Sequence, residues 1–241
     1  MIGITGNQSS PPFLWKGISF KQDDRVLKIG TDALLLATWI PKIISSSQYI
    51  LDVGTGCGVI ALLLAKAFPA AEVIGIDSDL NAVELAIQNA EVAGFENKFL
   101  INQSSLEEFA AMPEQKFDLI VSNPPFYLNH ILPVSRSMQS AKHATASPAE
   151  WMDAMTKILP EEGKIGLILP YAIAFDWIRE ANQRQWYCTS RLDIYSFAEE
   201  LHPKRSLLCL SRALDSPMQE KIIMYQQGKS YTIEYQEWLG L

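Results

Sequence analysis

The sequence predicts an α/β protein with a doubly wound, mostly parallel sheet of seven strands and helices on both faces. From about residue 48, short apolar segments alternate with longer segments whose apolar residues recur at helical spacing. Such alternation is typical of parallel strands joined by right-handed helical crossovers. A glycine-rich loop follows the first of these strands, at a position where open α/β sheets bind ligands.

The predicted elements follow one another in order along the chain. Strands are expected at residues 49–53, 72–77, 99–102, 117–122, 163–170, 191–197 and 205–212. Helices are expected at residues 59–68, 81–94, 104–112, 147–163 and 174–186. Gly94 is expected to end one helix, Ser147 to begin another before Pro148, and Ser78 or Asp79 to cap the helix after the second strand. Residues 220–235 are predicted to form a C-terminal hairpin that turns near Gly228.

Residues 1–47 are interpreted as an N-terminal extension to a domain that spans residues 48–241. The extension begins with a segment that lacks the basic and apolar regions of a signal peptide. It ends in the apolar pattern of residues 31–44, which predicts an amphipathic helix capped by Thr31 or Asp32 and packed over the sheet.

Composition limits the class of protein. The net charge of −7 and pI of about 5.0 argue against a general nucleic-acid-binding protein, although an enzyme needs only a local basic patch. Three scattered cysteines without a C-x-x-C pair predict a reduced, cytoplasmic protein without a structural metal. The longest apolar runs are shorter than the roughly 20 residues of a membrane helix, so a soluble protein is expected.

The glycine loop LDVGTGCG places Gly54, Gly56 and Gly58 between the first strand and a helix. Glycines permit tight turning and close approach of a ligand to the backbone. Val59 occupies the last glycine position of the dinucleotide fingerprint, and no G-K-[ST] of a phosphate-binding loop follows. Asp77 ends the second strand, where a carboxylate accepts hydrogen bonds from ribose hydroxyls.

The segment VSNPPFY ends the fourth predicted strand. Pro124 and Pro125 lack the N–H donor of a central strand, so the strand ends at or before Asn123. Phe126 and Tyr127 then place two aromatic rings behind a stiff loop. A plain turn would account for Asn-Pro but not for the aromatic pair.

These motifs together resemble the class I S-adenosylmethionine-dependent methyltransferases, whose fold is Rossmann-like. The NPPF tetrad resembles the subset that methylates amino nitrogens of planar groups. The resemblance implies that the glycines pass under the methionine portion of the cofactor, that Asp52 lies near its amino group, and that Asp77 holds the ribose. Ser105 stands where the family usually has an acid that contacts the adenine, which makes Ser105, or the backbone of the adjacent Ser104 or Leu106, a candidate contact in its place.

The chemistry of an exocyclic amine explains the tetrad. The lone pair is delocalised into the ring, so two acceptors on the N–H groups favour the pyramidal form that can attack the methyl group. The Asn123 side-chain oxygen and the Pro124 carbonyl can supply these acceptors, and the prolines fix them before substrate arrives. Phe126 offers a face on which an extruded base can stack. No general base is required before transfer.

The stretch FKQDDRVLKIGTDALLLATWI, with NPPFY and the later AKHAT, resembles the bacterial tRNA1(Val) adenine-37 N6-methyltransferase family over nearly the whole chain, most closely from Lys28 to Leu36. The implied substrate is the adenosine beside the anticodon of a tRNA. The resemblance also suggests that the helix of residues 31–44 acts as a lid, with Lys28 and Thr31 facing the cofactor pocket.

The candidate tRNA contacts follow the NPPF tetrad. Tyr127, Arg136, Lys142 and His143 leave the catalytic strand directly, although His143 could equally be a packed loop histidine. Lys204 with Arg205, and a group of basic residues before the core (Lys16, Lys21, Arg25 and Lys28), could extend a phosphate-binding face. No feature of the sequence specifies an oligomeric state.

Several other functions share parts of this pattern. The NPP[FY] tetrad also occurs in enzymes that methylate glutamine N5 in release factors or guanine N2 in ribosomal RNA. The short N-terminal extension disfavours the first, and the length disfavours the duplicated form of the second. A binding module with a degenerate cofactor site is disfavoured by the intact glycines and Asp77, and a nicotinamide oxidoreductase by Val59.

Overall fold

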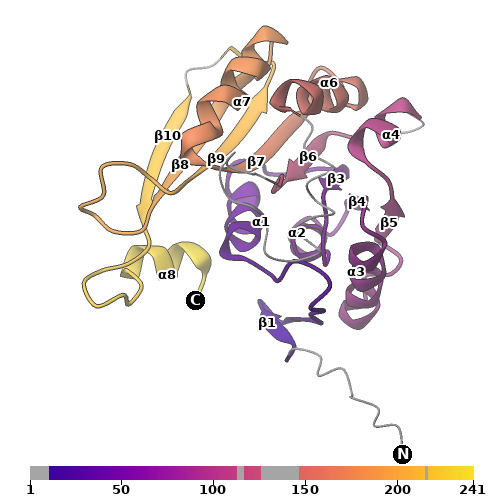
Figure 1. The fold of residues 1–241 in the computed structure, drawn as a ribbon, viewed down its shortest axis with the longest axis horizontal. Helices are drawn as coiled ribbons and strands as arrows, with labels where there is room; N and C mark the ends of the chain where they lie inside the picture. The colour runs from indigo at the N-terminus through magenta and orange to yellow at the C-terminus, as the bar shows by residue number, and fades with distance from the viewer. Residues whose placement is uncertain (1–10, 113–116, 126–146, 215–216) are drawn as a thin grey trace, which may run out of the picture.

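A sheet of eight strands forms the centre of the computed structural model, which describes residues 11–112, 117–125, 147–214 and 217–241 (Figure 1). The strand order is β10-β8-β9-β7-β6-β3-β4-β5, and β9 runs antiparallel to both of its neighbours, whereas the other paired strands are parallel. The strands are β3 (Tyr49–Val53), β4 (Glu72–Asp77), β5 (Phe99–Gln103), β6 (Leu119–Ser122), β7 (Lys164–Pro170), β8 (Tyr187–Tyr195), β9 (Arg205–Ser211) and β10 (Met218–Ile223). The doubly wound α/β fold is confirmed, with one strand more than predicted.

Helices cover both faces of the sheet (Figure 1). One face carries α1 (Thr31–Ile43), α2 (Val59–Ala67), α3 (Leu80–Ala93) and the C-terminal α8 (Ile233–Leu239). The other carries α4 (Leu106–Ala111), α6 (Pro148–Ile158) and α7 (Tyr171–Gln183). Residues 59–65 of α2 are all buried, because the helix packs on β3 and β4 with α1 and α3 beside it. This position explains why its sequence is apolar on every side.

Most of the helix caps are formed by the residues that the sequence predicts. Asp79 accepts a hydrogen bond from the Asn81 amide at 2.9 Å, Ser147 forms a reciprocal capping box with Glu150, and Gly94 ends α3 in the left-handed conformation, as predicted. The predicted cap of α1 is wrong. Gly30 occupies the cap position without a side-chain hydrogen bond, and Asp32 instead pairs with Arg205 at 2.7 Å.

The predicted C-terminal hairpin is also wrong in its second half. The turn forms around Gly228, where the Gln226 amide donates to the Ser230 carbonyl oxygen. After it, Thr232 accepts a hydrogen bond from the Tyr235 amide and begins α8. Tyr235 and Leu239 recur at helical spacing and are both buried. Tyr225 and Tyr231 form an antiparallel bridge across the predicted turn, and the residues before Tyr225 form β10, which joins the sheet parallel to β8.

The described residues before β3, from residue 11 onward, pack onto the domain. Strands β1 (Phe13–Trp15) and β2 (Ile18–Phe20) form a small antiparallel sheet that lies against α3. In α1, residues 33–40 are buried against α2 and β7. Within the described ranges, the helices are too short and too polar to span a lipid bilayer.

Candidate functional site

The site is built where the strand order reverses. Strand β3 pairs with β4 on one side and with β6 on the other, and all three run in the same direction. Their carboxyl ends therefore meet at one edge, with the glycine loop after β3, Asp77 at the end of β4 and Asn123 after β6. This is the place where open α/β sheets bind ligands.

The glycine loop needs its glycines for backbone reasons. Gly54, Gly56 and Gly58 have φ values of +70°, +56° and +82°, a region that disfavours residues with a Cβ. At Gly58 a Cβ would also lie 3.1 Å from the Phe99 ring, whereas at Gly54 and Gly56 it would meet no atom of the described residues within 4 Å. The loop is therefore held tightly at its end and open over its first two glycines.

Asp52 is fully buried at the start of the loop. One carboxylate oxygen accepts hydrogen bonds from the Thr55 hydroxyl at 2.8 Å and the Ala61 amide at 3.1 Å. The other oxygen, Oδ1, is buried without a partner among the described residues. Burial raises the pKa of Asp52 to about 7, since the charged form is poorly solvated, and the neighbouring Asp77 adds to the shift. A cationic ligand group at Oδ1 would stabilise the carboxylate.

Asp77 fixes the geometry of the opposite wall. Its two oxygens accept hydrogen bonds from the Gly56 amide at 2.9 Å and the Asp79 amide at 3.0 Å. Burial raises the pKa of Asp77, against the opposing effect of these hydrogen bonds. Each oxygen keeps acceptor capacity for a ligand hydroxyl.

Asn123 directly follows β6, on the other side of β3 from Asp77. The preceding residue, Ser122, donates a hydrogen bond of 2.7 Å to the Val53 carbonyl oxygen and locks the end of β6 to β3. The side-chain oxygen of Asn123 is buried and has no hydrogen-bond partner among the described residues. Pro124 is buried and Pro125 is exposed. A buried acceptor without a donor is expensive unless a ligand supplies one.

The remaining predicted residues have mixed positions. Ser105 begins α4, where it forms a capping box with Glu108, and this structural role accounts for its hydroxyl. Lys28 and Thr31 are exposed near the start of α1, and Lys28 forms an ion pair of 3.3 Å with Asp24. Phe126, Tyr127, Arg136, Lys142 and His143 lie outside the described residues.

Two features of the site were not predicted from the sequence. The buried Asn89 on α3 hydrogen-bonds both the Cys57 carbonyl in the glycine loop and the Lys21 backbone. A polar residue in the apolar stripe of a helix was the only available signal. At the carboxyl end of β7, the Tyr171 ring stacks on the exposed His202 ring, with centroids 5.8 Å apart. These two residues are 31 positions apart, and no pattern links them.

Comparisons with known proteins agree with this geometry. A family model described as "Methyltransferase small domain" matches residues 24–147. A tRNA1(Val) (adenine(37)-N6)-methyltransferase from Flavobacterium psychrophilum is 33% identical over 92% of this chain and 95% of its own length. The chain belongs to this methyltransferase family. An enzyme of the same name from Trichodesmium erythraeum is 31% identical over 95% of both chains.

The fold of this methyltransferase also matches solved structures. A predicted O-methyltransferase from Agrobacterium tumefaciens superposes with a TM-score of 0.67 at 18% identity, over 87% of this chain and 95% of that one. The cofactor of the family is S-adenosylmethionine, and the residues at the carboxyl edge fit it. The open space over Gly54 and Gly56 and the unpartnered oxygen of Asp52 suit a ligand with a close-lying chain and a cationic amino group.

Proposed function

We propose that this enzyme transfers a methyl group from S-adenosylmethionine to the N6 amino group of adenosine 37 in tRNA1(Val), in the cytoplasm. The observation that carries the proposal is the buried, unpartnered side-chain oxygen of Asn123 beside the glycine loop. An adenine amino group offers the N–H donor that this oxygen lacks. The two full-length relatives, whose names state this reaction, support the same substrate.

The cofactor is proposed to bind at the carboxyl ends of β3 and β4. Asp52 would hold the amino group, since its free oxygen is buried at the start of the loop. Asp77 would accept hydrogen bonds from the ribose, and Gly54 and Gly56 would let the backbone approach the ligand. The hydroxyl and the amide of Ser105 are both engaged in the capping box of α4, so the backbone of the adjacent Leu106 is the better candidate contact for the adenine.

The bound cofactor supplies an electrophilic methyl group on a positively charged sulfur. Asn123 and the Pro124 carbonyl orient the adenine amine by accepting its two N–H groups, so that its lone pair faces the methyl carbon. Transfer would give the methyl carbon a bond to the amine nitrogen in place of its bond to sulfur, and the nitrogen would then lose a proton. Because Ser122 fixes the end of β6 through the Val53 carbonyl, the acceptors are held in place before the substrate binds.

The Tyr171–His202 pair is proposed to bind an unpaired nucleotide that neighbours the target. Tyr171 directly follows β7, the strand beside β6, so the pair lies next to the loop that carries Asn123. The guanidinium of Arg191 lies 5.4 Å from the Tyr171 ring centroid, and this cation–π contact helps to hold the ring in place. Single-stranded RNA loops are typically bound by stacking bases on such exposed rings. Tyr127, Arg136, Lys142 and His143 remain proposed RNA contacts.

The test is methyl transfer to unmodified tRNA1(Val) with labelled S-adenosylmethionine, followed by mapping of the modified nucleoside. The expected product is N6-methyladenosine at position 37, and a tRNA with guanosine at that position should remain unlabelled. Label in a release factor would instead identify glutamine N5 methylation, and label in ribosomal RNA would identify guanine N2 methylation. Either result in place of tRNA methylation would reject the proposed substrate.

A further inference from the structure

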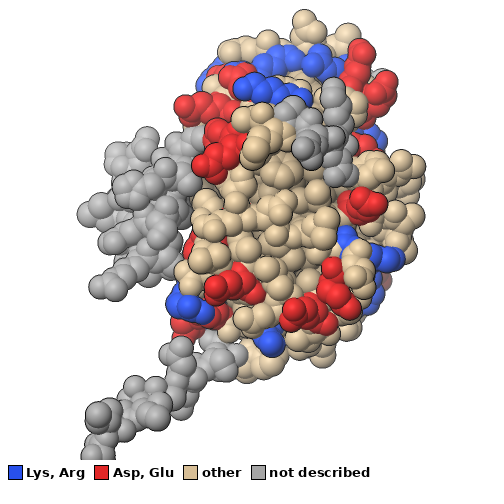
Figure 2. All heavy atoms as spheres, turned by 90° about the vertical axis from the view of Figure 1, so that its right-hand side faces the viewer, with Lys and Arg blue, Asp and Glu red and all other residues tan. Residues whose placement is uncertain are grey.

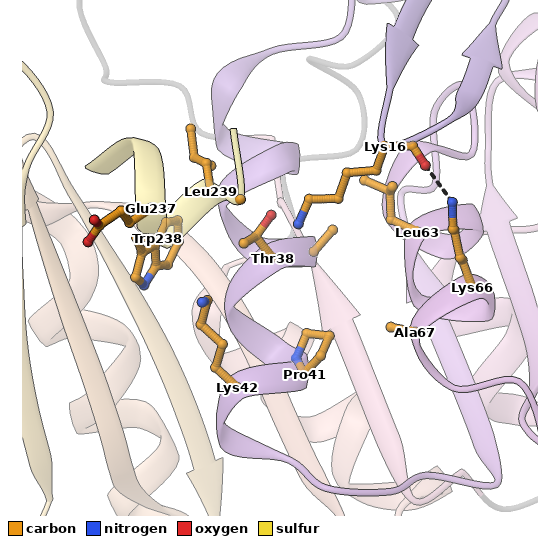
Figure 3. Close-up of a pocket in the computed structure, with 12 residues that line it drawn as sticks. Lys16, Thr38, Pro41, Lys42, Leu63, Lys66, Ala67, Glu237, Trp238 and Leu239 are labelled. Carbon is orange, nitrogen blue, oxygen red and sulfur yellow. Dashed lines mark hydrogen bonds between the residues drawn. The ribbon is translucent and has the colours of Figure 1, made fainter. Parts of the chain in front are cut away.

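A second pocket lies away from the carboxyl edge of the sheet. It has a volume of about 320 Å³ and is formed by α1, α2, the turn between β1 and β2, and the end of α8 (Figure 3). Its lining includes Lys16, Lys42, Lys66, Pro41, Leu63 and Trp238. Four segments that are distant in the sequence thus meet around one concave surface.

This pocket is separate from the methylation site. Lys42 and Lys66 lie in the last turns of α1 and α2, whereas both helices begin near the carboxyl edge. From Thr31 to Lys42, α1 rises by roughly 16 Å at about 1.5 Å per residue. A ligand in the pocket would therefore bind on the helical face and not beside Asn123.

Three ammonium groups gather at the pocket without balancing carboxylates. Figure 3 shows Lys16 and Lys42 turned toward the space between α1 and α8, with Glu237 pointing away from them. Across the described parts of the chain, none of the three lysines forms an ion pair with a carboxylate. Partial burial lowers the pKa of Lys16, and the charges of Lys42 and Lys66 lower it further. An anion in the pocket would relieve this repulsion.

The backbone and the aromatic ring hold two of the lysines in position. Lys16 has a φ of +46°, a conformation that is uncommon for a residue other than glycine, asparagine or aspartate. The Lys66 ammonium donates a hydrogen bond to the Lys16 carbonyl oxygen and fixes this turn (Figure 3). The Lys42 ammonium lies 5.6 Å from the centroid of the Trp238 ring, a cation–π contact. The side chains are therefore partly pre-arranged, which lowers the entropy that binding must remove.

We propose that this three-lysine pocket binds a phosphate group of the tRNA backbone, outside the nucleotide that is methylated. The inference rests on the proposed tRNA substrate. An enzyme with a net charge of −7 needs local concentrations of positive charge to hold RNA. On the side that carries α3, α4 and β5, the centre is uncharged, acidic residues are spread around it, and basic residues gather mainly at the upper end (Figure 2).

The pocket also lies in a suitable place for this role. The target base enters at the carboxyl edge, while the rest of a folded tRNA must pass over one face of the protein. A backbone that follows α1 from its first residue reaches the pocket after roughly 16 Å, well within the length of a short RNA stem. The pocket would then fix the direction in which the stem leaves the site.

The experiment compares the double variant Lys16→Glu/Lys42→Glu with the matched control Lys98→Glu/Lys157→Glu. The control residues are exposed and lie outside the pocket, so both variants change the net charge equally. Dissociation constants for unmodified tRNA1(Val) are measured by filter binding at several salt concentrations. The pocket variant should bind about tenfold more weakly than the control, and its logarithmic salt dependence should be shallower by about one, because one phosphate contact is lost.

Two further measurements test whether the variants are correctly folded and whether the pocket binds a tRNA phosphate or a free phosphate ion. Thermal melting and S-adenosylhomocysteine affinity should match the control, because neither residue contacts the glycine loop. Equal tRNA affinity and salt dependence in the two variants would overturn the proposal. So would inorganic phosphate binding that is lost in the pocket variant while tRNA affinity is unchanged, since this would assign the pocket to a free anion.

The outcomes separate this proposal from the proposed function. If tRNA affinity depends on the two lysines but methylation occurs at a nucleotide other than adenosine 37, only the assigned target is wrong. If adenosine 37 is methylated and the pocket variant binds tRNA as tightly as the control, only the pocket assignment is wrong.

Discussion

The side-chain amide of Asn89 donates a hydrogen bond of 2.9 Å to the carbonyl oxygen of Cys57, in the glycine loop. The same side chain accepts a hydrogen bond of 2.7 Å from the Lys21 amide. One buried residue of α3 therefore connects the cofactor loop to the segment that precedes α1. The loop has this external support in addition to its own backbone hydrogen bonds.

Replacement of Asn89 by alanine should destabilise the protein strongly. The change leaves the Cys57 carbonyl and the Lys21 amide without their partner in a part-buried region. The expected loss is about 2–4 kcal/mol in the free energy of unfolding, measured by urea denaturation. The exposed Asn97→Ala provides a control that should change stability by less than about 0.5 kcal/mol. A similar small change for Asn89→Ala would contradict the assigned support.

Asn123→Ala should reduce turnover while leaving cofactor affinity nearly unchanged. The lost acceptor acts on the amine in the transition state, so kcat should fall about 100- to 1000-fold. Affinity for S-adenosylhomocysteine, measured by calorimetry, should remain within about twofold. Asn102→Ala, an exposed asparagine at the end of β5, serves as the control. Near-normal turnover of Asn123→Ala would show that the oxygen does not orient the substrate.

Cofactor affinity should depend on pH through Asp52. Its pKa is raised to about 7 by burial, so in the free enzyme the carboxyl is largely neutral below this pH and ionised above it. A cationic amino group binds the ionised form better, so affinity for S-adenosylhomocysteine should rise from pH 5.5 to about 7 and then level off.

Asp52→Asn separates this effect from that of the nearby Asp77, whose pKa is also raised. The variant cannot ionise at position 52, so its affinity should be lower at neutral pH and should change less between pH 5.5 and about 7. An identical pH profile in the variant and the wild type would assign the dependence to another group.

Gly58→Ala should mainly lower the stability of the protein, whereas Gly56→Ala should mainly lower its affinity for the cofactor. At position 58 the new methyl group would lie 3.1 Å from the Phe99 ring at a φ of +82°, so stability should fall by about 2–3 kcal/mol. At position 56 the methyl group meets no protein atom within 4 Å, so the loss should be only about 1 kcal/mol. The methyl group would instead occupy cofactor space, and S-adenosylhomocysteine affinity should fall more than about tenfold. Unchanged affinity in Gly56→Ala would place the cofactor elsewhere.

His202→Ala should weaken tRNA binding without a change in cofactor affinity. Loss of a base-stacking ring costs about 1–3 kcal/mol, so KM for tRNA should rise about tenfold. Leu201→Ala removes a side chain that is 90% exposed in the same loop but outside the stack, and should leave KM unchanged. Equal KM values for the two variants would remove the Tyr171–His202 pair from the tRNA-binding surface.

Much of the fold could be predicted because local and global signals agree. The seven predicted strands and six predicted helices all occur, and Gly94, Asp79 and Ser147 act as expected at helix ends. The C-terminal segment differs because threonine, isoleucine and tyrosine favour strands, whereas the Thr232 cap and the burial of Tyr235 favour a helix. In this segment, tertiary packing of α8 outweighs the preference of the individual residues for a strand.

The parts of the site that were missed depend on contacts across the sequence. Asn89 reaches residues 32 and 68 positions away, and Asp32 caps no helix but pairs with a residue 173 positions later. The spacing of residues along the sequence does not predict contacts between residues so far apart. The glycines, Asp77 and Asn123 could be named as candidate site residues because each lies at the end of a strand or just after it. Parallel strands bring their carboxyl ends to one edge of the sheet.

The packing of α1 has a consequence for synthesis of the protein. Its apolar side shares a core with Leu207 of β9 and with Tyr235 and Leu239 of α8, and Asp32 pairs with Arg205. A nascent chain emerges from the ribosome with α1 long before these partners. Helix α2 can cover part of α1 early, but the surface of α1 that packs on β7 stays uncovered until residues 164–170 have been translated. Chaperones that bind apolar segments have their longest opportunity there.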